Sequence, residues 1–222
     1  MILVLSIGGS VLDHDRDRLS GYAGVLRDLV SLNHTVFVVV GGGATARDYI
    51  GMARIFDADE AFCDLIGIAV TRLNARLLIA ALGSAAYPVP PETQEDASVA
   101  ALSGRIVVMG GTIPGHTTDA VAAILAEYVH ADILIDATST DGIYTKDPKK
   151  YPDAVKLDEL SPARLVEIIA ADEMKAGANL PLDILAAKII ERSGIPTVVL
   201  DGREPGQVVD AVNGARIGTC LR

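Results

Sequence analysis

The sequence of 222 residues has no tryptophan, and aromatic residues make up only 4% of it. Hydrophobic residues nevertheless account for 50%, so the core must be built from aliphatic side chains. Aliphatic cores of this kind are typical of parallel sheets that helices cover on both faces. The length allows one such domain, and we expect an α/β fold in which residues 1–222 form a single unit.

Cysteines and long apolar runs are also scarce. The two cysteines, Cys63 and Cys220, lie far apart and have no partners at the spacing of metal ligands. They are typical of reduced thiols in a cytoplasmic protein, and we expect this location. No run of about 18 uncharged apolar residues is present, so we expect no membrane span. Residues 1–5 lack the basic flank of a signal peptide and predict a first strand instead.

Positive charge is in short supply, because the formal net charge is −10. An acidic surface argues against a broad contact with nucleic acid or with an anionic membrane, and we expect neither partner. A small anionic ligand stays compatible with this charge, since helix N-termini and a few Arg or Lys side chains can hold it locally.

Short apolar runs alternate with helical patterns along the whole chain, without internal repeats. This alternation predicts a three-layer αβα sandwich around a mostly parallel central sheet. The helix at 58–82 has an apolar surface wide enough for burial on two faces, partly in a subunit contact. Residues 149–160 are expected to form an exposed extended arm, and 174–181 a mobile lid. We expect strands at 2–7, 35–40, 85–87, 106–109, 132–136 and 196–200, and helices at 18–33, 58–82, 120–129, 161–171, 182–190 and 205–213.

Three loops rich in glycine or hydroxyl side chains each follow an apolar strand pattern, at 8–10, 41–43 and 110–118. In a parallel sheet such loops meet at one edge. Free backbone N–H groups, hydroxyls and a helix N-terminus suit an anion there, and three such loops suit a phosphoryl donor, an acceptor and the transferred group. The alternatives are a tight turn at 8–10 and an ordinary loop in which Thr117 or Thr118 caps the next helix. The patterns GxxxxGK[ST] and GxGxxG are absent.

Three charged side chains are candidates for this edge. Arg47 stands one turn into the helix after the second loop, within reach of a bound anion, or it is a solvated surface cation. Asp64 lies beside the apolar stripe of its helix and either accepts hydrogen bonds from a ribose or is a solvated edge residue. Lys188 falls off the apolar stripe of its own helix, where a solvated lysine is the alternative.

These motifs occur in a recognisable order over essentially the whole chain. They are Gly8-Gly9-Ser10, Val40-Gly41-Gly42-Gly43, Arg47, Asp64, the stretch from Gly110 to Asp119, and Asp141-Gly142-x-Tyr144-x-x-Asp147-Pro148. In this order the sequence resembles the amino acid kinase superfamily and, within it, the archaeal-type uridylate kinases.

The resemblance implies a transferase that moves the γ-phosphoryl group of ATP to UMP, giving UDP and ADP in pyrimidine nucleotide biosynthesis. It also implies Mg²⁺, held mainly by the phosphates, and a homohexamer. The N-terminal part of the domain would bind the acceptor and the C-terminal part ATP. The UMP-binding residues would be Gly42, Asp64, Thr112, Ile113, Pro114, Gly115, His116, Thr117 and Thr118. The ATP-binding residues would be Gly9, Ser10, Gly43, Arg47, Thr138, Ser139, Tyr144 and Asp147.

One position departs from the superfamily. Many relatives have a lysine two residues before the first glycine pair, where this chain has Ser6. Another cation must then meet the transferred phosphoryl group, or Mg²⁺ and backbone N–H groups do more of the work. Lys188 is the candidate, with Arg47 as a second catalytic cation.

No general base is required for this transfer, because the phosphate of UMP is already an anionic nucleophile. Two alternatives to a UMP kinase remain. One is a sibling kinase for another small phosphate or carboxylate, and the other is a non-catalytic nucleotide or oxyanion-binding protein of the same superfamily.

Overall fold

A seven-stranded sheet forms the centre of the molecule, with the strand order β3-β2-β1-β4-β8-β9-β7. The computed structural model describes residues 1–12, 15–146, 148, 150–173 and 182–222. All neighbouring strands of this sheet are parallel except β8 and β9. The strands are β1 (Ile2–Ile7), β2 (Thr35–Val40), β3 (Val107–Met109), β4 (Ile133–Thr138), β7 (Glu159–Leu160), β8 (Thr197–Asp201) and β9 (Thr219–Leu221). Two more, β5 (Ile143–Tyr144) and β6 (Lys156–Leu157), pair separately as an antiparallel ribbon.

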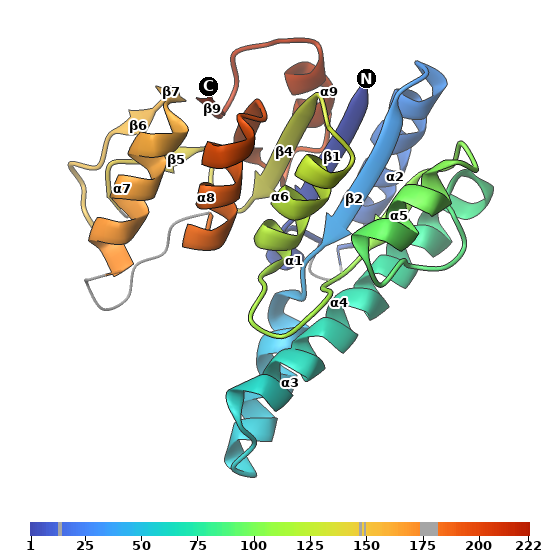
Figure 1. The fold of residues 1–222 in the computed structure, drawn as a ribbon, viewed down its shortest axis with the longest axis horizontal. Coiled ribbons are helices and arrows are strands. Elements are labelled where there is room, and N and C mark those ends of the chain that lie inside the picture. Colours follow the sequence, from blue (N-terminus) through green and yellow to red (C-terminus); the bar gives the residue numbers. More distant parts are fainter. Residues whose placement is uncertain (13–14, 147, 149, 174–181) are drawn as a thin grey trace.

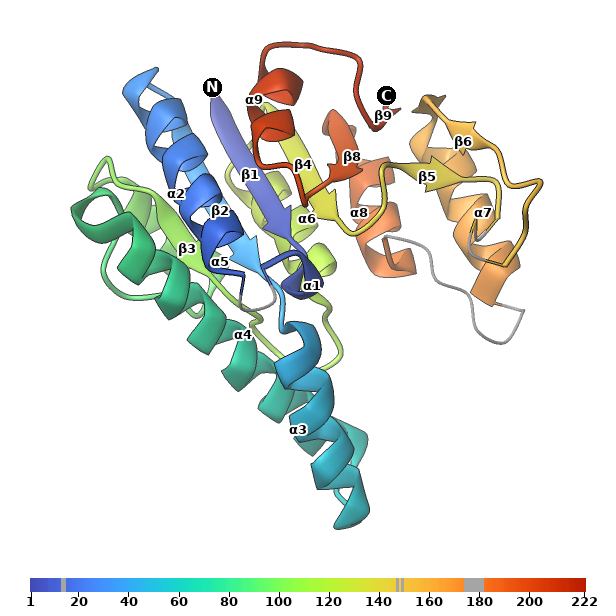
Figure 2. The ribbon, with the colours of Figure 1, turned by 180° about the vertical axis from the view of Figure 1, so that it is seen from behind.

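Helices cover both faces of the sheet, which confirms the predicted three-layer sandwich (Figures 1 and 2). The helices on one face are α5 (Gln94–Ala101), α6 (Thr118–Tyr128), α7 (Pro162–Glu173) and α8 (Ile184–Ser193). Those on the other are α2 (Arg16–Ser31), α4 (Glu60–Leu82) and α9 (Gly206–Val212). Three further helical segments are α1 (Gly9–Leu12), α3 (Gly43–Ile55) and the 3-10 turn η1 (Gly83–Ala85).

The sheet separates two hydrophobic cores, because successive strand residues point to opposite faces. In β1, Val4 packs in the core beneath α6 and α8, whereas Leu3 and Leu5 pack in the core beneath α2 and α4. All three side chains are fully buried. This two-sided burial explains why the strands are nearly continuous runs of Val, Ile and Leu.

Four local expectations need correction. Residues 8–10 do not form a simple turn, because Gly9 and Ser10 begin the short helix α1. The helix expected at 18–33 runs from Arg16 to Ser31, since Asp15 caps it through the N–H groups of residues 17 and 18. In place of a strand at 85–87 there is a single bridge between Ala86 and Ile106. The expected arm at 149–160 contains β6 and β7. The lid expected at 174–181 lies outside the described residues.

Helices α3 and α4 form a hairpin that projects beyond the edge at which β1 and β2 end (Figure 1). The buried residues of α4, among them Ala75, Leu78 and Leu82, pack against the sheet. Residues 60–85 are long and apolar enough to cross a membrane by length and composition alone, a test that core helices of soluble proteins also pass. The hairpin therefore joins a core-forming half to a projecting half.

Candidate active site

The three glycine-rich or hydroxyl-rich loops lie at one edge of the sheet, as the sequence predicts. They follow β1, β2 and β3, which are neighbouring parallel strands. The first two loops touch: a Cβ atom added to Gly9 would lie 1.9 Å from the backbone nitrogen of Gly43, and one added to Gly41 would lie 2.4 Å from that of Gly9. Only glycine fits at these two positions, so the loops after β1 and β2 share one compact backbone surface.

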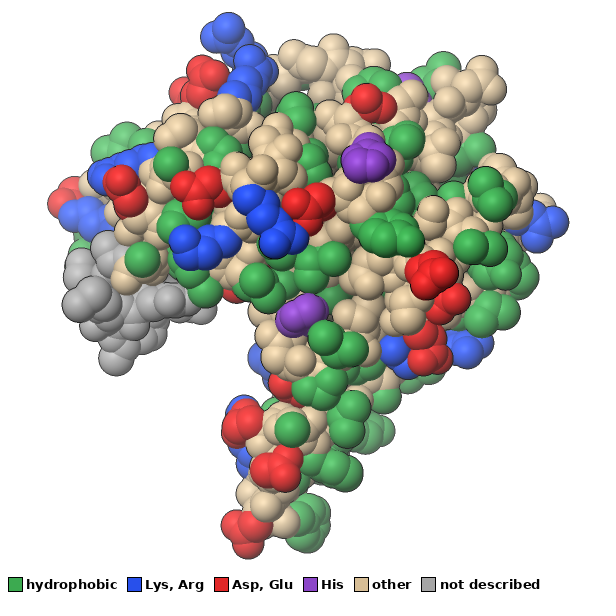
Figure 3. Space-filling view, viewed as in Figure 1, with side chains coloured by type: hydrophobic (Ala, Val, Ile, Leu, Met, Phe, Trp, Pro, Cys, Tyr) green, Lys and Arg blue, Asp and Glu red, His purple; other side chains and the backbone are tan. Residues whose placement is uncertain are grey.

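A cleft of about 270 Å³ opens beside this surface, at the base of the α3–α4 hairpin. Figure 3 shows the notch between the hairpin and the rest of the molecule. Predicted acceptor residues from three separate segments line the cleft, namely Gly42, Asp64, His116, Thr117 and Thr118, together with Gly43, Arg47, Thr71 and Gly111. Arg47, which the resemblance assigns to ATP, therefore lies with the acceptor group.

The third loop is held in place from two sides. The Gly115 N–H donates to Oδ2 of Asp64 at 2.8 Å, and Gly115 has a φ of 83°, in the region that favours glycine. Thr117 caps α6, since its Oγ1 accepts from the Ala120 N–H at 3.0 Å, and its hydroxyl donates to Asp183. The capping alternative is thus realised within the cleft. Thr117 has already used its one donor hydrogen, so it cannot donate to an anion. The Thr118 hydroxyl has no hydrogen bond to the described residues and is the one available to an anion at this helix end.

His116 contributes a polar atom that lacks a partner. Its Nδ1 is buried, yet it forms no hydrogen bond with the described residues. Buried polar atoms are seldom left unpaired, because each costs about 1–3 kcal/mol. A ligand in the cleft would supply that partner.

Apart from Gly43 and Arg47, which line the cleft, the predicted ATP residues that the structure describes lie directly after β1, at or after the end of β4, or in β5. Gly9 and Ser10 follow β1, whereas Thr138 ends β4 and Ser139 comes directly after it. The Gly8 N–H donates to the Ala137 carbonyl at 2.9 Å, which holds these two segments together. Tyr144 stands in β5, where its hydroxyl donates to Asp141 at 2.9 Å. Asp147 lies outside the described residues.

Lys188 is exposed on α8 and makes no hydrogen bond or ion pair with the described part of the chain. Helix α8 begins after Asp183, the residue that contacts Thr117, so its N-terminus lies at the edge of the site. Nothing in the geometry brings the Lys188 ammonium to the glycine loops, and its catalytic role stays a prediction.

A buried acidic pair lies beneath the site, and the sequence analysis missed it. The Ser6 hydroxyl donates to Oδ1 of Asp119 at 2.8 Å. Ser6 also stands opposite Asp136 in the pairing of β1 with β4. Asp136 is 2% exposed, and its Oδ2 has no partner among the described residues. Asp136 stands within the otherwise apolar run of β4, and this acidic residue could have indicated the pair in the sequence.

Burial disfavours the ionised forms of both carboxyl groups. It raises the pKa of Asp119 to about 6, while the hydrogen bond from Ser6 lowers that pKa in part and the charge of Asp183 raises it further. Burial also raises the pKa of Asp136 well above its usual range, and the charge of Asp119 adds to this effect. Neither carboxylate has an ion-pair partner in the described ranges. Ser6, which stands where the resemblance leads us to expect a lysine, therefore has two buried carboxyl groups as neighbours.

The described residues contain no group of three or more His, Cys, Asp or Glu side chains that converges on a metal-ion position. Two carboxylates alone still suit Mg²⁺, which is usually held by one or two carboxylates together with substrate phosphates. The arrangement therefore favours a cation that arrives with a phosphorylated ligand.

Comparison with known proteins connects this geometry to a family. Residues 1–201 match the model of the amino acid kinase family. The chain is 55% identical to the uridylate kinase of Methanosarcina mazei over 216 residues, covering 96% of this chain and 92% of the relative. It is 52% identical to the uridylate kinase of Archaeoglobus fulgidus, with full coverage of both chains. The crystal structure of the Archaeoglobus fulgidus uridylate kinase superposes with a TM-score of 0.92 over the full length of both chains.

The acidic pair predicts a pH-dependent stability difference for Asp119→Asn. The folded-state pKa of Asp119, about 6, lies above its ordinary value of 3.8. The stability that the protonated carboxyl contributes is therefore present below about pH 4 and is lost as the pH rises through 6. Asn cannot ionise, so it does not lose this stability. The free energy of unfolding of the variant, relative to that of the wild type, should therefore rise by about 1–3 kcal/mol from pH 4 to pH 8.

Urea unfolding of both proteins at pH 4, 6 and 8 measures this difference. Asp48→Asn, a change at an exposed carboxylate on α3, is the matched control and should show no such trend. A stability difference between Asp119→Asn and the wild type that does not vary with pH would contradict the argument from burial.

Proposed function

The chain belongs to the amino acid kinase family, and we propose that it is a uridylate kinase that transfers the γ-phosphoryl group of ATP to UMP. The observation that supports this proposal is the cleft at the ends of β2 and β3, which gathers five of the predicted acceptor residues beside the contact of Gly9 with Gly43. We assign this cleft to the acceptor and the ends of β1 and β4 to the donor. Sequence identity above 50% over nearly full length supports UMP as the acceptor.

Catalysis in this site is positioning and charge stabilisation. The phosphate of UMP is an anionic nucleophile, so the site needs no base to activate it. The N-termini of α3 and α6 both meet the cleft and direct backbone N–H groups and positive dipole ends at it. Fixed donors of this kind stabilise charge on the transferred group without reorganisation.

Arg47 serves the acceptor phosphate in this proposal, in place of ATP. It lines the same cleft as Asp64 and His116, one turn from the N-terminus of α3. Asp64 has one carboxylate oxygen bonded to Gly115, which leaves the second oxygen for the ribose hydroxyls. Both assignments predict effects on UMP rather than on ATP.

Mg²⁺ accompanies ATP and is held mainly by the donor phosphates. Asp136, whose Oδ2 has no partner among the described residues, and Asp119, which has no ion pair with them, would be the carboxyl groups available to such a cation. When bound, Mg²⁺ neutralises phosphate charge during the transfer. Ser6 keeps the Asp119 carboxylate oriented by its hydrogen bond.

The acceptor assignment is tested by the release of ADP with ATP and Mg²⁺, measured in parallel for UMP, CMP, dUMP, AMP and isopentenyl phosphate. We expect the highest kcat/KM with UMP, because Asp64 and His116, which line the cleft, offer hydrogen-bonding groups to its ribose and base. Preferred turnover of another acceptor would identify a sibling kinase. ATP binding without any turnover would favour a non-catalytic nucleotide-binding protein.

Arg47→Ala and Asp64→Asn should raise the KM for UMP about 10–100-fold, since each change removes a charge-assisted hydrogen bond worth about 1.5–3 kcal/mol. The KM for ATP should change less than about twofold. Arg105→Ala, at an exposed arginine that precedes β3, is the control. If only the KM for ATP rises in Arg47→Ala, Arg47 binds ATP, as the resemblance in the sequence implies.

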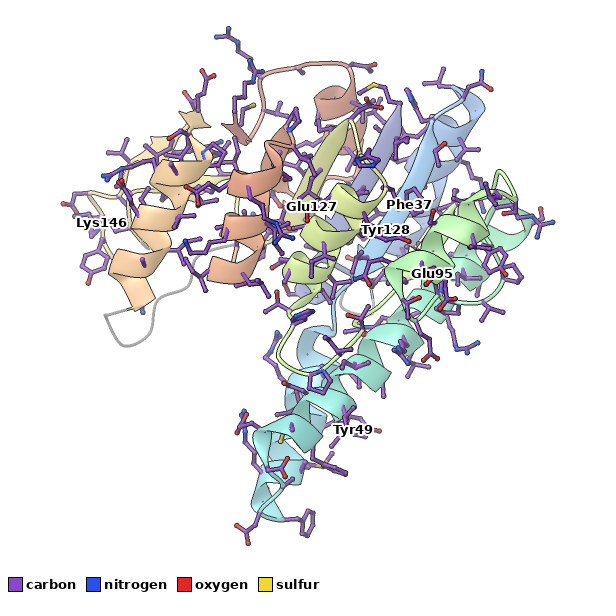
Figure 4. All side chains as sticks on the ribbon, in the orientation of Figure 1. Phe37, Tyr49, Glu95, Glu127, Tyr128 and Lys146 are labelled. Atoms are coloured by element: carbon purple, nitrogen blue, oxygen red, sulfur yellow. The ribbon has the colours of Figure 1, made fainter. Side chains whose placement is uncertain are left out.

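The hairpin is the proposed contact between copies of the chain in a homohexamer. Its exposed apolar side chains include Tyr49, Met52, Ile55 and Phe56 on α3 and the turn, and Phe62, Leu65, Leu73 and Leu77 on α4. Figure 4 shows Tyr49 on the projecting half of the hairpin. Contiguous exposed apolar surface of this kind marks a contact with another protein surface.

Light scattering coupled to size-exclusion chromatography, in buffer without detergent, should give a mass of about six chains. Phe62→Glu should lower that mass, because it places a charge in the apolar contact, whereas Leu102→Glu, at an 86% exposed residue after α5, should not. A monomer in the wild type would overturn the hexamer.

We also infer a cytoplasmic protein without nucleic-acid or membrane partners. The net charge of −10 opposes binding to phosphate backbones and anionic lipids. Helix α4 buries Val70, Ala75 and Leu78 within the domain, which is the behaviour of a core helix. Recovery of the hexamer without detergent, in the experiment above, tests this point as well.

A further inference from the structure

Three polar residues on one stretch of α4, Thr71, Arg72 and Asn74, bond to the backbone of the two loops that form the acceptor cleft. Thr71 is 6% exposed and bridges two segments. Its Oγ1 accepts from the Gly111 N–H at 2.7 Å, and its hydroxyl donates to the Ile68 carbonyl at 2.7 Å. The donor hydrogen of this hydroxyl is thus used within the protein, so it cannot donate to a bound anion.

Arg72 holds the same loop through its carbonyl groups. Its Nε donates to the Gly111 oxygen at 3.2 Å and its Nη2 to the Thr112 oxygen at 3.4 Å. Its Nη1 pairs with Glu92 at 2.7 Å. Every nitrogen of the guanidinium therefore has a protein partner, and Arg72 is not among the residues that line the cleft. Its contacts are those of a brace rather than of a phosphate-binding cation.

Asn74 does the same for the second glycine loop. Its Nδ2 donates to the Gly41 carbonyl at 2.9 Å and to the Gly42 carbonyl at 3.3 Å. In a trans peptide the C=O and the following N–H point in opposite directions. Arg72 and Asn74 hold the carbonyl groups of both loops against α4. The N–H group of the residue that follows each of these carbonyls therefore points away from α4.

The close fit between these loops and α4 leaves little alternative packing. A Cβ on Gly110 would lie 2.5 Å from Oγ1 of Thr71 and 2.7 Å from the backbone nitrogen of Arg72. One on Gly42 would lie 3.6 Å from Cγ2 of Thr71. Thr71 thus stands between the two loops, with a hydrogen bond to Gly111 of one and its methyl group beside Gly42 of the other.

We propose that Thr71, Arg72 and Asn74 are positioning residues, which set the orientation of the peptide groups that bind the acceptor. The proposal rests on the proposed function and adds residues that do not act on substrate themselves. Glycine-rich segments are conformationally free, so an anion site built from them needs external bonds to hold its N–H groups in one arrangement. A displacement of about 1 Å is enough to cost about 100-fold in rate.

The test compares Thr71→Val, Thr71→Ser and Arg72→Met with the wild type. Thr71→Val removes the acceptor for the Gly111 N–H at nearly constant volume, and Arg72→Met removes three donors while keeping the apolar stem. Each should raise the KM and the calorimetric dissociation constant for UMP about tenfold, with the KM for ATP changed less than about twofold. Thr71→Ser keeps the hydroxyl and should stay within about threefold of the wild type. Arg76→Met, at an exposed arginine one turn further along α4, is the matched control and should leave both constants unchanged.

Unfolding temperatures of all variants separate orientation from general loss of structure. A Thr71→Val enzyme that melts near the wild type and keeps its affinity for UMP would overturn the proposal, as would equal losses for UMP and ATP. If Thr71→Val does not fold, Asn74→Ala takes its place, since it removes only the bonds to Gly41 and Gly42. The KM and the dissociation constant of this variant for UMP then test the proposal in the same way. Turnover of UMP by the wild type is measured in the same series. Its absence would contradict the proposed function, whereas normal turnover with unaffected variants would contradict only the positioning role.

Discussion

The direct contact of backbone with backbone between the loops after β1 and β2 is the constraint on which the site depends. Gly9 and Gly41 approach the opposite loop so closely that a single Cβ atom would collide with backbone. This contact joins the ends of β1 and β2 in one backbone surface, across which the proposed donor and acceptor sides meet. Bare peptide groups are also the only groups small enough to line such a space while offering N–H donors to anions.

The same closeness explains the chemistry beneath the loops. Strand β1 lies between β2 and β4, so Ser6 is 1% exposed and faces Asp136 across the ladder and Asp119 from α6. The Ser6 hydroxyl fills this position and orients the Asp119 carboxyl group, while Oδ2 of Asp136 has no partner among the described residues. No cation of the described residues pairs with either acid, so in the proposed reaction the positive charge comes with the nucleotide or from the cleft wall. Ionisation of Asp119 costs stability as the pH rises from about 4 through 6, a cost that suits a functional site better than a structural one.

Most of the fold was predictable because its signals are local. Buried parallel strands are continuous apolar runs, and the runs at 2–7 and 35–40 match β1 and β2 residue for residue. The errors fall where tertiary contacts override local pattern. The strand expected at 85–87 is a single bridge, since only Ala86 meets Ile106, and the short strands β6 and β7 form because partners from other segments pair with them. In the site, the three loops share one edge of the sheet as expected, whereas the assignment of single residues to ATP or UMP stays a prediction. Arg47, which the resemblance assigns to ATP, lines the cleft together with Asp64.

The fold class, the common edge of the three loops and the family could be inferred from local patterns, because apolar periodicity and the order of glycine motifs are properties of neighbouring residues. The meeting of distant side chains depends on how the helices pack against the sheet. Thr71 and Arg72 bond to a loop about 40 positions away, and Ser6 reaches an acid 113 positions away. No spacing rule within one helix or strand records such contacts, since the packing of α4 and α6 against the sheet creates them.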